Sequence, residues 1–483
     1  MSNRFSLCLG DRHCRMLFVS LLVTATVGCG PDAEKSTPSE RIEKPVIDSD
    51  DSPTQTAESQ DAVESTNVDV EPAEEPLSTT RVESSETRST PTDPVTIRDT
   101  AIESLESGKL DRAFELARKA KRLDPENPET IFLNARVLAA RHRFAEAVQI
   151  LDDLALSVPD ARLPVLGQTA EWMVTEGRFE EAEARFKKLS DLVGEGGLVS
   201  RRLAQLFLRQ GRCVEAAAHL RLLCNEGNVE EGELRTLLTV SNPIAFDDSD
   251  DTLEPIGVLG RVRSLISAND WAAARAEIES VDSPSSDESA IRARIYATTQ
   301  DFDSLRAWLE GDGKQTGNTN ADGWFAVACL SVHDGEHAQA VDAFCNVVLR
   351  DPTDAEAYAM MSDSLSKLGI EDKAKLASTR SELLLQTQKI GKRMSKSESP
   401  DTKDLSTLTE LLGKLRRPSE ALAWRAVETI YAQSRSEITR EEAIKRLEQI
   451  NRNRLELPSD ARGLMEFVLC GIDPQALLDE QAK

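Results

Sequence analysis

The stretch AIESLESGKLDRAFELARKAKRLDP, residues 101–125, decides the fold of this chain because its pattern returns at a regular interval. Its residue Ala113 is followed by equivalent alanines at Ala147, Ala182 and Ala216, which gives steps of 34, 35 and 34 residues. A unit of this length holds two helices and can bury its apolar face only against its neighbours. The sequence therefore predicts an all-α solenoid of stacked helical hairpins.

A second small residue lies twelve positions before each of these alanines. Two antiparallel helices approach closely only where both lack bulky side chains, so each pair predicts where the helices of a hairpin touch. The four pairs are Ala101/Ala113, Ala135/Ala147, Ala170/Ala182 and Ala204/Ala216, and the same spacing returns at Ala328/Ala340 and Ser362/Ala374. A glycine five residues before the second small residue, as at Gly108 and Gly177, predicts a left-handed turn between the helices.

These features resemble the tetratricopeptide repeat family. Residues 111–125 and 338–352 (AQAVDAFCNVVLRDP) are similar to the second helix of that family and its closing proline. The resemblance implies a binding surface lined by the first helices, and a protein or peptide as the partner. Transferred in register, the candidate binding residues are Arg98, Phe132, Arg136, Arg201, Gln205, Arg209 and Phe325, with Cys329 beside the last of them. Ordinary solvated side chains are the alternative for each.

The first 29 residues resemble a bacterial lipoprotein signal. Three arginines precede the apolar stretch 16–27, which is too short to span a bilayer, and Gly28-Cys29 follows it. The resemblance implies that Cys29 becomes the lipidated N-terminus, and that the chain faces the periplasm from the cell envelope, with the outer membrane expected. Cleavage without lipidation is the alternative.

The remaining boundaries follow from composition and register. Residues 30–93 contain no aromatic side chain and cannot bury enough apolar surface to offset the entropy of ordering, so they predict a disordered acidic tether. Beyond Ala216 the register becomes irregular. The predicted parts are a signal peptide (1–28), the lipidated cysteine with its linker (29–93), four hairpins (94–228), diverged helical repeats with a solvated acidic loop at 247–251 (229–320), two hairpins (321–388), a basic linker (389–403) and a diverged helical cap (404–483).

The composition restricts the classes of molecule that this chain is expected to bind. The formal charge of −26 argues against nucleic acid, because phosphate binding requires clustered lysine and arginine. The sequence contains no phosphate loop and no nucleophile elbow, so neither a small-molecule substrate nor a cofactor nor a catalytic residue is expected. The functional hypothesis is a membrane-anchored scaffold that binds another protein.

Two alternatives stay open. His333 and His337 enclose an H-x-x-E-H pattern, which in a zinc metallohydrolase would need both histidines on one helix, whereas Gly335 predicts a turn between them. Residues 415–424 (LRRPSEALAW) resemble the last repeat of arrays joined to an ASPIC/UnbV propeller, which would make the chain the helical partner of such an exported system. For Cys329 and Cys345, on the two arms of one hairpin, a disulfide is conceivable and two packed thiols are favoured.

Overall fold

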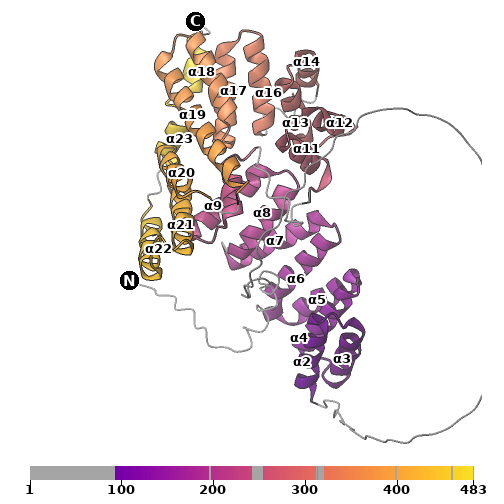
Figure 1. Cartoon of the computed structure of the whole chain (residues 1–483). Coiled ribbons are helices and arrows are strands. Elements are labelled where there is room, and N and C mark those ends of the chain that lie inside the picture. The colour runs from indigo at the N-terminus through magenta and orange to yellow at the C-terminus, as the bar shows by residue number, and fades with distance from the viewer. Residues whose placement is uncertain are drawn as a thin grey trace, which may run out of the picture. The chain divides into compact units, whose positions relative to one another are not determined.

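The computed structural model describes residues 93–481, apart from 195–196, 242–253, 312, 314–319, 398–399 and 458–460. Helices joined by short turns make up this part of the chain, and no strand occurs within it (Figure 1). The expected all-α fold of consecutive hairpins is confirmed. The signal peptide, Cys29, the tether and the acidic loop at 247–251 lie outside the described residues. By internal contacts the chain divides into two units, Met1–Thr100 and Ala101–Lys483.

The first block alternates first and second helices of successive hairpins. Its helices are α2 (Pro94–Glu106), α3 (Leu110–Leu123), α4 (Pro128–Ala140), α5 (Phe144–Ser157), α6 (Arg162–Thr175), α7 (Phe179–Val193), α8 (Gly197–Arg209) and α9 (Cys213–Glu226). A short 3-10 turn, η1 (Pro159–Ala161), precedes α6. Both alanines of every predicted pair in this block are completely buried. The small pairs therefore lie where the helices touch.

Each hairpin reverses at a residue with positive φ, five positions before the second small residue. Gly108 and Gly177 take this conformation at φ 71° and 78°, and His142 takes it at 59° where the second hairpin has no glycine. The next residue closes the helix: the Lys109 amide donates to Ser104 O at 2.8 Å, and the Arg143 amide donates to Leu138 O at 3.0 Å. This is the Schellman pattern, which satisfies carbonyls that the helix end leaves open.

The middle region keeps the same turn chemistry although its sequence diverges. It contains α10 (Glu231–Leu237), α11 (Gly257–Ser267), α12 (Trp271–Glu279), α13 (Ser286–Thr298) and α14 (Phe302–Glu310). Asn269 and Gln300 have positive φ, and each lies five residues before a completely buried side chain, Ala274 or Leu305. The hairpin register thus continues through the stretch where the spacing of alanines fails.

The next helices are α16 (Ala321–His333), α17 (His337–Arg350), α18 (Ala355–Lys367) and α19 (Glu371–Met394). The last of these corrects the linker expected at 389–403, because α19 stays helical up to Met394 and α20 (Thr402–Lys414) begins eight residues later. Ile390 and Met394 are buried against Leu405 and its neighbours on α20. That tertiary contact holds in helical form a segment whose basic, serine-containing composition predicts a linker.

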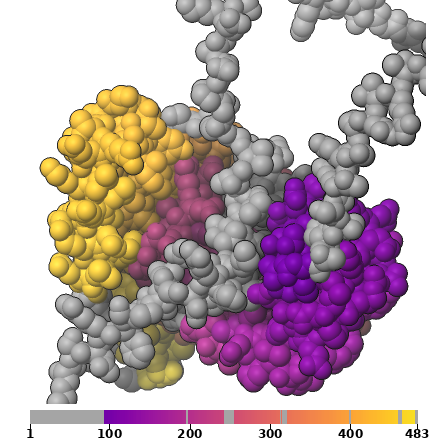
Figure 2. Space-filling model, turned by 90° about the horizontal axis from the view of Figure 1, so that it is seen from below, coloured from indigo at the N-terminus to yellow at the C-terminus, as the bar shows by residue number. Residues whose placement is uncertain are grey.

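The C-terminal helices pack back on earlier parts of the unit. They are α21 (Pro418–Ser434), α22 (Arg440–Leu455), α23 (Ala461–Val468) and α24 (Pro474–Gln481). One hydrophobic cluster joins side chains of α8, α9 and α10 to side chains of α19, α20 and α21, and Figure 1 shows α21 beside α9. Cys470 and Leu477 are buried in a second cluster with residues of α16–α19. In the space-filling view, yellow atoms of the C-terminal part of the chain gather on one side of the molecule (Figure 2).

Candidate functional site

Successive first helices of the N-terminal block carry half-buried polar side chains at equivalent places. Arg136, Glu171 and Gln205 each follow the first alanine of a hairpin pair, on α4, α6 and α8. Phe132 lies one turn before Arg136, and Arg202 pairs with Glu171 at 2.7 Å and donates to Gln205 Oε1 at 3.1 Å. We call Phe132, Arg136, Glu171, Arg202 and Gln205 the first-helix face. All five are neither fully buried nor fully exposed.

Partial burial of Arg136 and Glu171 costs free energy, because both charged groups are partly removed from water. Burial lowers the pKa of Arg136, and the Glu106 carboxylate on α2 only partly opposes that shift. Burial likewise raises the pKa of Glu171, against the opposing effect of Arg202. Desolvation disfavours the charged form of each group and outweighs the opposite charge beside it. A partner that brings hydrogen-bonding groups to this face would therefore be stabilised by charges that already exist there.

Two of the predicted binding residues are core residues instead. Phe325 is 1% exposed, lies edge-to-face with Phe344 at 6.2 Å, and is covered by the Arg294 guanidinium at 4.0 Å from its ring centroid. Arg98 is 8% exposed. Cys329 is also buried, with its Sγ 3.8 Å from the sulfur of Met360. These side chains cannot line an accessible surface, because the register places a residue along a helix without saying what later elements cover it.

Two further predicted residues are engaged within the chain. Arg201 Nε lies 2.7 Å from Glu233 Oε1 on α10, and its Nη1 lies 3.3 Å from Glu230. Arg209 Nε donates to the carbonyl of Glu254 at 3.0 Å, just before α11. Both arginines thus fasten α8 to the elements that follow the first block. Of the predicted residues, Phe132, Arg136 and Gln205 remain on the first-helix face.

Sequence reasoning missed Arg202 as a member of this face. The transferred register points to its neighbour Arg201, which is turned toward Glu233. The signal that could have found it is the pairing of charges between equivalent helices. Glu171 of α6 and Arg202 of α8 occupy nearby places in consecutive hairpins, so aligning the hairpins against one another brings an acid opposite a base.

The zinc hypothesis fails on helix geometry. His333 is the last residue of α16 and His337 is the first residue of α17, with Gly335 at φ 80° in the turn between them. The two imidazoles therefore do not share one helix, and the His333 ring stacks on Phe302 with centroids 3.9 Å apart. Within the described ranges, no group of three or more histidine, cysteine or acidic residues is placed to hold a metal ion. The five described cysteines are buried free thiols.

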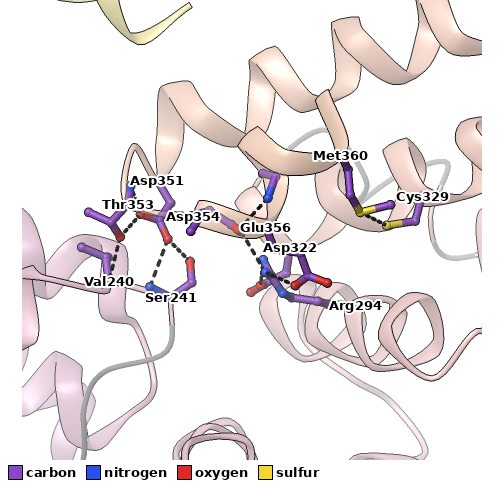
Figure 3. Close-up of polar contacts among 12 residues, drawn as sticks. Val240, Ser241, Arg294, Asp322, Cys329, Asp351, Thr353, Asp354, Glu356 and Met360 are labelled. Atoms are coloured by element: carbon purple, nitrogen blue, oxygen red, sulfur yellow. Dashed lines mark hydrogen bonds and ion pairs between the residues drawn. The ribbon is translucent and has the colours of Figure 1, made fainter. Parts of the chain in front are cut away.

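Besides the first-helix face, the structure contains a buried ionic network, which no sequence motif predicts. Arg294 of α13 lies 3.3 Å from Asp322 of α16 and 2.8 Å from Asp354, the N-cap of α18 (Figure 3). Arg263 of α11 also pairs with Asp322. Burial acts to raise the pKa of Asp322, but the two guanidiniums outweigh it and hold the pKa below its usual range.

The same assembly extends to the segment after α10. Asp351 accepts a hydrogen bond from the Ser241 amide at 3.0 Å, and Thr353 Oγ1 accepts one from the Val240 amide at 2.8 Å (Figure 3). Arg263 Nη1 donates to the Ser241 carbonyl at 2.8 Å. Since its members are buried and paired with one another, this network fastens helices together and does not offer charges to a partner.

One segment of the chain matches a known protein family. The sequence profile described as tetratricopeptide repeat matches residues 104–163. No curated protein sequence matches the chain. No described helix is both long and apolar enough to cross a membrane.

Several solved structures align with most of the chain at low identity. A tetratricopeptide repeat protein from Parabacteroides merdae ATCC 43184 is 12% identical over 74% of this chain and 99% of that chain, with a TM-score of 0.22. The APC/C hetero-tetramer Cut9–Hcn1 is 13% identical over 75% and 84%, with a TM-score of 0.27. The human IFIT1 dimer with PPP-AAAA is 14% identical over 76% and 92%, with a TM-score of 0.25.

The family match falls on the segment where the register is cleanest, from α2 into α6. This segment also holds the pair Ala135/Ala147 and the positive-φ turns at Gly108 and His142. Repeats of this kind serve as scaffolds for protein–protein interaction. Residues 104–163 match the tetratricopeptide repeat family, and the described part of the chain has a tetratricopeptide-like fold of consecutive helical hairpins.

Proposed function

We propose that this protein is a lipid-anchored scaffold that faces the periplasm of a bacterial envelope and binds another protein through the first-helix face. The anchor is supported by the sequence of residues 1–29, where a basic head and a short apolar stretch precede Gly28-Cys29. The aromatic-free, acidic residues 30–93 supply a tether between the lipid and the repeats.

The observation that carries the binding proposal is the row of half-buried polar side chains on consecutive first helices. Burial shifts the pKa of Arg136 downward and that of Glu171 upward, so both charged groups are already partly desolvated on this face. An incoming peptide that pairs with them gains hydrogen bonds to charged groups whose desolvation has already occurred. Hydrogen bonds of this type contribute about 1.5–3 kcal/mol each.

The anchor is tested by Cys29→Ser. Without the thiol no lipid can be attached, so we expect the variant to move from the membrane fraction to the soluble fraction after cell fractionation. Cys213→Ser serves as the matched control, because that thiol lies in a folded helix and its replacement should leave the fractionation unchanged. Recovery of Cys29→Ser with the membranes would argue against a lipoprotein.

The binding proposal is tested by affinity capture from detergent-solubilised membranes with the mature chain as bait. We expect Arg136→Gln and Gln205→Ala to reduce the captured partner at least about threefold, the effect of losing one charge-assisted contact. Lys121→Gln, an exposed change on second helix α3, should leave capture unchanged. Circular dichroism of each variant establishes that the fold is kept. Equal capture by all three variants would contradict a role for this face.

A further inference from the structure

A pocket with four arginines opens between helices that are far apart in the sequence. Arg221 of α9, Arg380 of α19, and Arg416 and Arg417 in the turn before α21 line it, and its empty volume with the open mouth is about 990 Å³. Glu420 is the one carboxylate among its lining residues. We call this site the arginine pocket. It stands out in a protein whose formal charge is −26.

The guanidiniums differ in how far they are engaged. Arg380 and Arg416 lie over the Phe467 ring, 3.6 Å and 4.8 Å from its centroid, and Arg380 donates to the Phe467 carbonyl. Arg417 pairs with Glu420, yet its Nη1 is buried without a hydrogen-bond partner. Arg221 forms no hydrogen bond or ion pair with another described residue. Among the described residues that line the pocket, four guanidiniums therefore lie beside one carboxylate, that of Glu420.

The start of α21 adds to this potential. Pro418 and Ser419, its first two residues, line the pocket, and α21 continues for 17 residues. Unpaired amides at a helix N-terminus and the aligned peptide dipoles favour a negative charge nearby. The helix end thus acts in the same direction as the four arginines.

Most of the remaining lining is apolar. Leu464, Phe467 and Val468 of α23 line the pocket together with Tyr358 of α18 and Leu415. Leu464 is 44% exposed, so part of this apolar wall is open to solvent. A ligand that fits such a site combines an anionic group with an apolar group next to it.

We propose that the arginine pocket binds an acidic peptide segment of a partner protein, in which a glutamate or aspartate lies beside a large apolar side chain. The carboxylate meets Arg221 and Arg417 at the start of α21, and the apolar side chain packs on Leu464 and Phe467. A polyanion is disfavoured, because every one of its charges is repelled by the net negative chain, whereas one or two carboxylates suffer that repulsion only once or twice. The proposal rests on the proposed function only in taking a protein as the ligand, since its residues lie outside the first-helix face.

The test is fluorescence anisotropy with the full mature chain and a labelled, C-terminally amidated peptide of sequence Glu-Leu-Glu-Leu-Glu. We expect saturable binding that weakens as salt rises from about 50 to about 300 mM, because exposed charge pairs are screened. The peptide Gln-Leu-Gln-Leu-Gln should bind at least about tenfold more weakly, since several charge-assisted contacts are lost together.

Variants at Arg221 and Leu464 test separately how charged contacts and apolar contacts contribute to peptide binding. Arg221→Gln should weaken binding about threefold through loss of one carboxylate contact, and Arg221→Glu should weaken it more. Leu464→Ser should weaken binding about threefold through loss of apolar contact. Arg162→Gln on α6 and Leu156→Ser on α5, which replace exposed side chains elsewhere, are the matched controls and should leave binding unchanged.

Equal affinity of wild type, Arg221→Gln and Leu464→Ser for the peptide would overturn the proposal, as would an absence of saturable binding. Displacement of the peptide by a ten-nucleotide oligothymidine at lower concentration than by unlabelled peptide would also overturn it, in favour of a polyanion. Failure of the first-helix variants in the capture experiment would leave these titrations unaffected. The two proposals can therefore fail separately.

Discussion

Ala147 holds two helices at close range because it adds almost nothing to the space between them. It is completely buried on α5, opposite Ala135 of α4. Ala147→Leu should overpack this contact and reduce the free energy of unfolding by about 1–3 kcal/mol. Urea denaturation measures the change, and Ala145→Leu, an exposed change on the same helix, should have little effect. An unchanged midpoint for Ala147→Leu would mean that the helices do not meet at this residue.

Alanine substitutions at two turn glycines distinguish the cost of backbone strain from the cost of a steric clash. Gly108 has φ 71° with nothing near the position of an added Cβ, so Gly108→Ala should cost only the left-handed penalty, about 1 kcal/mol. Gly211 has φ 75°, and a Cβ there would lie 2.8 Å from the Leu259 carbonyl oxygen. Gly211→Ala should therefore be clearly more destabilising in the same denaturation assay. Equal costs for the two substitutions would contradict the close approach of α11 to this turn.

Small pairs and turn glycines could be predicted from the sequence because both follow from local geometry. The positive φ of His142 and Asn269 is harder to predict, since residues other than glycine take that conformation uncommonly, although histidine and asparagine do so more often than most. Phe325 was misplaced for a related reason. Its place on the first helix was right, but Arg294 of another hairpin covers its ring.

Helices of the middle and later hairpins are joined by Asp322 of α16. Its carboxylate is buried between Arg263 and Arg294, so removing it leaves two buried guanidiniums without their shared partner. Asp322→Asn keeps the shape and should cost about 3–5 kcal/mol in unfolding free energy. Asp111→Asn breaks an exposed pair with Arg141 and should cost at most about 1 kcal/mol. Similar small costs for both would show that the buried network contributes little.

The pH dependence of stability, compared between wild type and Asp322→Asn, tests the role of the Asp322 carboxylate independently. The pKa of Asp322 is lower in the folded chain than in the unfolded chain, so its contribution is complete above the unfolded value of about 3.9 and is lost as pH falls through the folded value. The stability difference between wild type and Asp322→Asn should therefore be constant from about pH 7 to 5 and shrink below about pH 4. A difference that grows at low pH would contradict the assigned direction of the shift.

At the scale of elements, the positions of the helices could be predicted from the sequence, but the contacts between helices that are distant in sequence could not. Prolines at 125, 159 and 352 end α3, α5 and α17 two residues earlier, as expected from their restriction of the preceding residue. The extension of α19 to Met394 depends on burial against α20, and the ionic network joins α11, α13, α16 and the N-cap of α18. Such contacts between distant segments leave no local pattern in one sequence.

At the scale of the whole molecule, the C-terminal helices do more than cover the last repeat. The sequence predicts a helical cap over 404–483 but gives no sign of the surface that it covers. Tyr358 Oη of α18 donates to the Val468 carbonyl at 3.0 Å. The Arg380 guanidinium of α19 lies over the Phe467 ring and donates to the Phe467 carbonyl. Helices α23 and α24 thus stabilise hairpins that precede them by a hundred residues or so in the chain.

Ending the chain at Glu456 tests this arrangement, because it removes α23 and α24 and leaves the hairpins beneath them intact in sequence. Buried Cys470 and Leu477 and the partners of Tyr358 and Arg380 are lost together. In a repeat protein each unit is stabilised mainly by the units that it touches. Amide hydrogen exchange should therefore accelerate in α17, α18 and α19 and stay unchanged in α3–α6.

A single change calibrates the size of that effect. Tyr358→Phe removes the hydroxyl that donates to the Val468 carbonyl and also interacts with Arg380, and it should weaken protection of α18 by about 1 kcal/mol, well below the effect of the truncation. If the truncated chain instead exchanged faster in every helix, the unit would unfold as one cooperative body and nearest-neighbour stacking would not describe it. If exchange in α17–α19 stayed as in the full chain, the contacts of α23 and α24 would carry no stability, and the arginine pocket would lack a fixed wall on the side of Phe467.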